Sequence, residues 1–403
     1  MSPFRGVKRW LRRRWRRINA GVKRSVFASG FTLLHLAVFL TPFGARSENW
    51  LMDRWFGMRG QLPPPEDVII VAIDEKTYRQ LGLSSLEPLP REVHARLLEL
   101  LGDFRAQKVV FDISFNSEGA KPESDLAFAK ALKLVPTFIG QYLKRTIRNG
   151  PDGRVLSEEE WIKPLPLLAA SATGTPAINL AIEDRIVRRF FLYEEQGRLR
   201  TPMASIVCHD EVTCPSEPTL GDYINYYGPA GTIKSISLSD VINGDPEHLA
   251  RYFLGKIVLI GSKSLTQVGI EHKDAFLTPF PETLISGVEI HATVVGNVME
   301  QKWLQRLNPR IEFTCLSAFA FLTAFMVISL APLQSEIVLS SLAIGLAVTS
   351  YALFIAGTFF PGALLLCLFM PGLFLISTFY YFVIFQRSHK QMESALGVKL
   401  HVK

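Results

Sequence analysis

The segment Gly255-Lys-Ile-Val-Leu-Ile-Gly-Ser262, with Gly287-Val-Glu-Ile-His-Ala-Thr-Val-Val-Gly-Asn-Val-Met299 after it, decides the fold. The first part is a short apolar run rich in β-branched residues, which is typical of a strand buried on both faces. The second part predicts a helix. Within about ten further residues the chain enters an apolar block that is too long for a globular core. The pattern predicts a folded α/β unit connected almost directly to membrane spans.

A second and a third buried strand precede this segment in the chain. Val68–Ile73 and Lys108–Phe115 are apolar and β-branched, and between them Pro90–Phe104 has leucines at helical spacing. Strand, helix and strand over this length form a βαβ unit, whose crossover makes the two strands parallel. We therefore expect an α/β domain with a mainly parallel central sheet over residues 66–308.

Four apolar segments predict four transmembrane α-helices, at residues 26–43, 311–330, 337–356 and 364–385. Soluble helices of this length would show a polar face, and the last three segments show none. The first segment could instead be the core of a signal peptide. Phe43 stands where a small residue is wanted before a cut at Ala45, so we favour an uncleaved anchor.

Charge gives the expected orientation of the chain. Residues 1–25 hold ten Lys and Arg and no acid, and subtracting these ten from the net charge of +7 leaves about −3 for the rest. We interpret residues 1–25 as a cytoplasmic tail at the membrane surface rather than a nucleic-acid-binding arm, and expect no nucleic-acid partner. One crossing then places residues 44–308 outside the cytoplasm, beginning with a connector at 44–65. Three more crossings return residues 386–403 to the cytoplasm. The chain is expected in the inner (plasma) membrane.

The chain has four cysteines. Cys315 and Cys367 fall in apolar blocks, where thiols are generally inert. Cys208 and Cys214 are six residues apart in a stretch placed outside the membrane, where a disulfide between them is plausible. No Cys/His spacing suggests zinc, and we expect no cofactor.

Several motifs, in order over some 240 residues, resemble the CHASE family of sensory extracellular domains, in its second class. They are Val68-Ile-Ile-Val-Ala-Ile-Asp-Glu75, Pro90-Arg-Glu-Val-His-Ala-Arg-Leu-Leu98, Val109-Val-Phe-Asp-Ile-Ser-Phe115, Asp184-Arg-Ile-Val-Arg-Arg189, Asn225-Tyr-Tyr-Gly-Pro229, Gly255–Ser262, Thr278-Pro-Phe280 and Gly287–Ala292. The resemblance implies one membrane helix before a periplasmic sensor of a bacterial receptor and three after it. Such receptors usually continue into a cyclase or kinase. Only eighteen residues follow Phe385, so we expect either a stand-alone sensor or a truncated receptor.

Polar residues are expected to gather at one end of the sheet. Ligands of open parallel sheets bind beyond the carboxyl ends of the strands. Asp74, Asp112 and Ser262 stand at three such ends, and Asp274 and His291 could reach the same place. Such a cluster could bind a cation through oxygen ligands or a polar small molecule. Alternatively, Asp74 and Asp112 cap loops or helix starts.

The leading hypothesis is a sensory receptor module that binds an unknown extracytoplasmic small molecule or protein and passes a signal through the bilayer. Such a module could act as a homodimer. A membrane-tethered, metal-dependent hydrolase acting through Asp74 and Asp112 is an alternative. A scaffold whose outer domain binds another protein is a third. The sequence contains no catalytic motif such as Gly-x-Ser-x-Gly or a kinase loop, which favours a non-enzyme.

Overall fold

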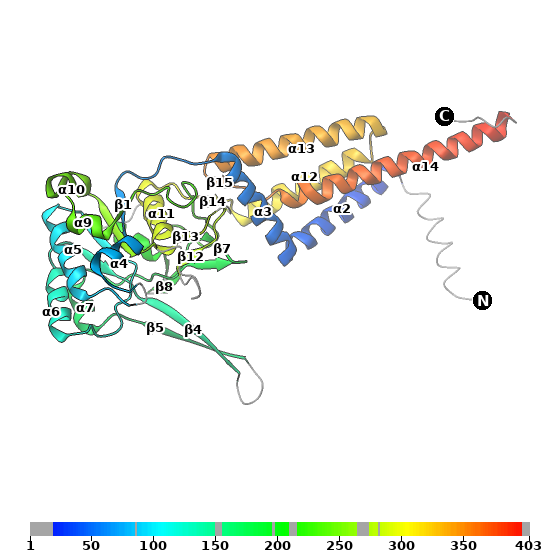
Figure 1. Cartoon of the computed structure of the whole chain (residues 1–403). Helices are drawn as coiled ribbons and strands as arrows, with labels where there is room; N and C mark the ends of the chain where they lie inside the picture. Colours follow the sequence, from blue (N-terminus) through cyan, green and yellow to red (C-terminus); the bar gives the residue numbers. More distant parts are fainter. Residues whose placement is uncertain are drawn as a thin grey trace. The chain divides into compact units, whose positions relative to one another are not determined.

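A computed structural model describes residues 19–84, 87–149, 155–195, 198–208, 216–263, 274–280 and 283–396. The chain divides into two compact units. One comprises residues 56–305, and the other comprises residues 1–55 together with 306–403. Figure 1 shows the elements of both.

A five-stranded sheet forms the centre of unit 56–305. All its strand pairs are parallel, which confirms the mainly parallel sheet predicted from the sequence. The strand order is β10 (Ser235–Ser237), β1 (Val68–Ile73), β11 (Ile257–Ser262), β2 (Lys108–Phe111) and β3 (Thr137–Ile139). Strands β1 and β2 are buried along their whole length, as a sheet covered on both faces requires.

Helices cover both faces of this sheet. On one face α5 (Arg91–Asp103) and its neighbours bury a core that includes Val71, Phe111 and Ile260. On the other face α11 (Gly287–Glu300) packs against β1 and β11 (Figure 1). The other helices of the unit are α4 (Glu75–Leu81), α6 (Pro122–Ala131), α7 (Pro166–Ser171), α8 (Pro202–Val207), α9 (Leu238–Asn243) and α10 (Pro246–Phe253).

Antiparallel hairpins are added to this α/β layer structure. The longest, β4 and β5, projects away from the sheet (Figure 1). The pairs are β4 (Tyr142–Asn149) with β5 (Val155–Ile162), β6 (Ala181–Glu183) with β7 (Ile186–Arg189), β8 (Tyr193–Glu195) with β9 (Arg198–Arg200), and β12 (Ala275–Phe276) with β13 (Ile285–Ser286).

Helix α11 is apolar in sequence, yet it carries polar side chains into the interior. Every residue from Gly287 to Val298 is buried. Glu289 accepts hydrogen bonds from the backbone N–H groups of Gly231 and Ile233. The side-chain amide of Asn297 exchanges two hydrogen bonds with the backbone of Asn225. These bonds fix the helix to the loop that precedes β10, because breaking one would leave a buried polar group unsatisfied.

Among its described residues, the other unit contains four helices that are long and apolar enough to cross a membrane, as the sequence predicted. They are α2 (Ala20–Phe39), α12 (Pro309–Val327), α13 (Pro332–Ile355) and the segment Leu365–Val383, which comprises the π-helical turn η1 (Leu365–Phe369) and most of α14 (Met370–Leu396). Side chains such as Ala28, Leu316, Ala320 and Leu373 form their common core. The remaining strands are two short ones, β14 (Gln305–Arg306) and β15 (Thr358–Phe359).

Most of the predicted connector at 44–65 is a helix, α3 (Pro42–Arg59). Proline suits the first helical turn, where its missing N–H is not needed. Leu51, Met52, Trp55 and Phe56 follow at helical spacing and are all buried. The Pro-rich end at 63–65 suggested a connector over the whole stretch. A proline breaks regular structure only at its own position, so it does not exclude a helix before it.

Candidate functional site

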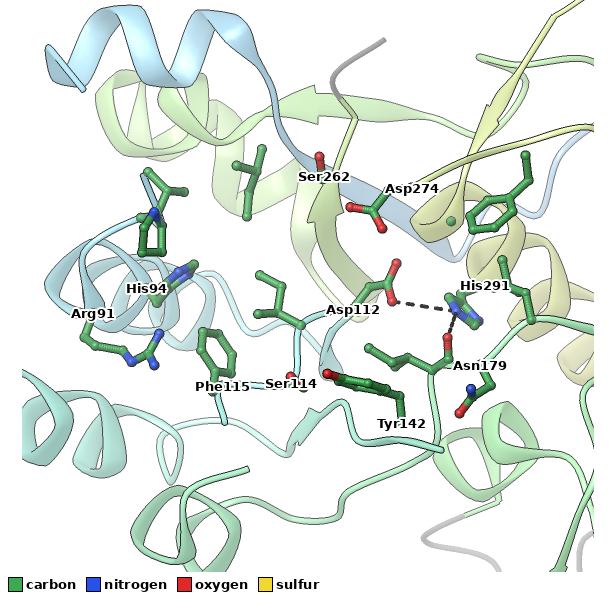
Figure 2. Close-up of a pocket in the computed structure, with 18 of the residues that line it drawn as sticks. Arg91, His94, Asp112, Ser114, Phe115, Tyr142, Asn179, Ser262, Asp274 and His291 are labelled. Atoms are coloured by element: carbon green, nitrogen blue, oxygen red, sulfur yellow. Dashed lines mark hydrogen bonds and ion pairs between the residues drawn. The ribbon is translucent and has the colours of Figure 1, made fainter. Parts of the chain in front are cut away.

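A cavity of about 690 Å³ opens where the parallel strands end. This volume lies within the range of small-molecule sites, roughly 300–1,000 Å³. Figure 2 shows the side chains that line it. They come from the ends of β1 and β11, from the loop after β2, from the helices α4, α5 and α11, and from β4, β6, β12 and neighbouring loops. This is the position at which open parallel sheets bind ligands.

Four of the five residues predicted for a site line this cavity: Asp112, Ser262, Asp274 and His291. The strand register brings the first two together. Ser262 lies beside the last residue of β1, and the backbone N–H of Asp112 donates to the carbonyl of Ile260 at 2.8 Å. Helix α11 contributes His291, four residues after its start at Gly287.

Gly261 allows α11 to lie close to the strand ends. A Cβ on this glycine would lie 2.7 Å from Cβ of Val288 in α11 and 3.1 Å from Cβ of Asp112. Any larger residue would therefore push the helix away from the sheet. The glycine in the segment that decides the fold thus also sets the distance between the two sides of the cavity.

Asp112 is the carboxylate that lies farther inside the cavity. Its side chain is only 16% exposed, and its Oδ1 lies 3.7 Å from Nε2 of His291, too far for a hydrogen bond (Figure 2). Nε2 of His291 lies closer, at 3.2 Å, to the carbonyl oxygen of Ile178. Burial raises the pKa of Asp112. The charge of Asp274 raises that pKa further, whereas His291 lowers it.

Asp74, the fifth predicted residue, does not line the cavity. It is the N-cap of α4, and its Oδ1 accepts from the backbone N–H and the hydroxyl of Thr77 at 2.8 and 2.9 Å. The hydroxyl of Ser237 donates to the same oxygen at 2.8 Å. The structure thus agrees with the alternative interpretation of Asp74 as a helix cap.

The opposite side of the cavity consists of residues that were not predicted from the sequence. Arg91 and His94 of α5 line it there, three residues apart and therefore on one face of the helix (Figure 2). Tyr142 at the start of β4 and Asn179 also line the cavity, and Figure 2 shows Asn179 beside His291. The helix-spaced pair within Pro90-Arg-Glu-Val-His94 was the available signal. Nothing local in the sequence marks Tyr142 or Asn179.

Two further predictions concern cysteines and metals. Cys208 is disulfide-bonded, but Cys214 lies outside the described residues, so their pairing stays a prediction. In the described part of the chain, no group of three or more His, Cys, Asp or Glu side chains is arranged to hold a metal ion. Asp74 and Asp112, proposed together for a hydrolase, do not share the cavity.

No curated protein and no solved structure matches the chain. The sequence model of the CHASE2 domain matches residues 30–331, which is most of the chain. The match includes the second half of α2 and all of α12, the candidate membrane helices that precede and follow unit 56–305 in the sequence. The chain therefore belongs to the CHASE2 domain family, a family of sensory extracellular domains.

Proposed function

We propose that unit 56–305 is an extracytoplasmic sensor that binds a small molecule in the cavity and passes the signal to the membrane helices. The cavity itself is the observation that carries this proposal. It lies beyond the carboxyl ends of the parallel strands, and side chains from loops, three helices and three hairpins converge on it. A ligand that touches all of these elements would favour one arrangement of them over another, as signalling requires.

The proposed topology has both termini in the cytoplasm and residues 44–308 on the outside of the inner membrane. An even number of candidate spans and the basic stretch at 1–25 support it. A reporter that is active only in the cytoplasm, fused after Lys403, should be active. Activity of a reporter that works only outside the cytoplasm would contradict the four-span topology.

Helix α11 offers a route for the signal. Its first turns line the cavity through Gly287 and His291. Farther along, Asn297 holds the backbone of Asn225. The side chain of Asn225 in turn accepts a hydrogen bond from Arg59, and Arg59 also donates to the carbonyl of Tyr226. Arg59 is the last residue of α3, the helix that contains the boundary between the two units. A shift of α11 at the cavity would therefore change the contacts of α3.

Filling the cavity tests the binding proposal. Ser114→Trp places a large ring among the lining residues, and Ile182→Trp does so from a position that is 55% exposed and tolerant of size. Ser157→Trp on the exposed surface of β5 is the matched control. The probes are amines, carboxylates and amides built on phenylethyl, cyclohexylethyl and indolylethyl bodies, measured by thermal unfolding of the full chain in detergent.

Compounds that stabilise the wild-type chain should lose their effect in both cavity variants and keep it in Ser157→Trp. Binding that survives both tryptophans would place the ligand elsewhere and refute the proposal. The route through α11 is tested by hydrogen exchange of α3. A bound compound should alter exchange there, and Asn297→Val should remove that response while binding persists. Unaltered exchange of α3 in the wild-type chain on binding would reject this route.

A further inference from the structure

Two carboxylates, those of Asp112 and Asp274, line one side of the cavity. Asp112 lies inside and Asp274 is exposed at the mouth. They are close enough for the charge of Asp274 to act on the pKa of Asp112. Within the part of the chain that the structure describes, the carboxylate of Asp112 accepts no hydrogen bond, and Nε2 of His291 lies 3.7 Å from its Oδ1. Its oxygens are thus available to a donor that enters the cavity.

The positive side chain on the opposite side is already neutralised. Nε of Arg91 lies 3.1 Å from Oδ1 of Asp125, and both side chains are more than 90% buried. Nη2 of the same guanidinium donates to the carbonyl of Ser117 at 2.7 Å. Asp125 is not among the cavity-lining residues, so it cancels the charge of Arg91 without facing a ligand. Among the described residues, Arg91 therefore brings no unpaired positive charge to the cavity.

His94 adds no charge to the cavity at neutral pH. Burial, and next the charge of Arg91, lower the pKa of His94 to about 3. The residue is 2% exposed, and its Nδ1 meets no partner among the described residues. A buried ring nitrogen without a partner costs free energy.

Apolar and aromatic side chains make up much of the remaining lining. Leu89, Phe115, Tyr142, Ile178 and Phe276 are among them. Such surfaces bury the hydrocarbon part of a ligand, and aromatic faces also attract cations. Phe115 already does this within the protein, since the guanidinium carbon of Arg91 lies 4.6 Å from the centre of its ring.

From this arrangement we infer that the cavity selects organic cations: molecules with an ammonium group on an apolar or aromatic body. The ammonium lies between Asp112 and Asp274, and the body lies against Phe115, Tyr142 and Ile178. The inference rests on the proposed function, because it assigns a ligand class to the same cavity. A carboxylate ligand would meet the like charge of Asp112 at one end and a guanidinium already paired with Asp125 at the other.

The nine compounds of the binding experiment also test this selectivity, because each body carries an amine, a carboxylate or an amide. Amines should stabilise the full chain, and the matching carboxylates and amides should bind at least about tenfold more weakly. Asp112→Asn and Asp274→Asn should each weaken amine binding by about tenfold and leave amide binding unchanged. Asp67→Asn, which removes an exposed carboxylate paired with Lys256, is the matched control and should change nothing.

The outcomes separate the two proposals. If carboxylates or amides bind best and the tryptophan variants abolish their binding, the cavity is a binding site and the cation inference is wrong. If amines bind but ignore both asparagine substitutions, the inference is also wrong, because the carboxylates then do not select them. If no compound that binds responds to any cavity variant, the proposed function fails together with the inference.

Discussion

Asp74 and Asp112 occupy equivalent places in the sequence and different places in the structure. Each directly follows a buried parallel strand, β1 for the first and β2 for the second. Asp74 accepts three hydrogen bonds and caps α4. Asp112 faces a cavity, accepts no hydrogen bond from the described residues, and has a raised pKa. A carboxylate with all its partners stabilises the fold, whereas one without them is available for binding.

The difference comes from the segment that succeeds each strand. After β1 the chain enters α4 at once, and Thr77, three residues after Asp74, supplies the N–H and hydroxyl that the cap needs. After β2 no helix begins at Asp112, and the next one, α6, starts at Pro122. The backbone N–H groups that satisfy a capping carboxylate are therefore missing at Asp112. The segment after β1 therefore supports the structure, and the loop after β2 is available for binding.

The largest expected effect is the loss of stability on removing the capping carboxylate. Asp74→Ala should lower the free energy of unfolding by about 2–3 kcal/mol, because it removes an N-cap and deprives the buried hydroxyls of Thr77 and Ser237 of their acceptor. Chemical denaturation of the full chain measures this. Asp245→Ala, which removes the more exposed cap of α10, should cost about 1 kcal/mol or less. Loss of amine binding in a folded Asp74→Ala protein would break the comparison by making both aspartates binding residues.

The second prediction uses the raised pKa of Asp112. Amines bind its ionised form, so their affinity should fall as the pH drops through that pKa, by up to about tenfold per pH unit. Burial and then the charge of Asp274 raise the pKa, and His291 lowers it. Asp274→Asn should therefore move the midpoint of the pH profile to lower pH. Isothermal titration calorimetry in two buffers should show proton release on binding near this midpoint, and affinity that does not vary with pH would contradict the assignment.

The sequence was sufficient to predict the framework of this site. β-Branched apolar runs indicated β1, β2 and β11, and their parallel pairing placed Asp112 and Ser262 at one edge of the sheet. It did not distinguish Asp74 from Asp112, although Thr77 at the third position after Asp74 was a readable capping signal. Tyr142 and Asn179 could not have been found, because they reach the cavity from segments whose packing depends on the whole tertiary structure. The pairing of Arg91 with Asp125, 34 residues later, was hidden for the same reason.

The third prediction is that removing the cavity carboxylate stabilises the ligand-free protein. The folded-state pKa of Asp112 is raised, so ionisation of this group lowers the stability of the protein. The stability that the protonated carboxyl contributes is fully present below the unfolded pKa and is lost as the pH rises through the folded pKa. Asp112→Asn removes this cost and should raise the free energy of unfolding at neutral pH by about 1 kcal/mol, the usual scale of stabilising substitutions at functional sites. Denaturation of wild type and variant at neutral and acidic pH measures it. The gain should shrink at acidic pH, and a destabilised variant at neutral pH would mean that Asp112 is structural, like Asp74.

The smallest effect is expected for the ion pair beside the capping site. Lys76 Nζ lies 2.5 Å from Asp240 Oδ1 and joins α4 to α9, but the two side chains are 45% and 43% exposed. Solvent screens such a pair, so Lys76→Met should change the free energy of unfolding by less than about 0.5 kcal/mol. The same denaturation experiment compares it with Asp74→Ala. A loss of equal size in both variants would show that the exposed ion pair, rather than the buried hydrogen bonds of Asp74, holds α4 in place. Asp74 would then have lost the structural role that distinguishes it from Asp112.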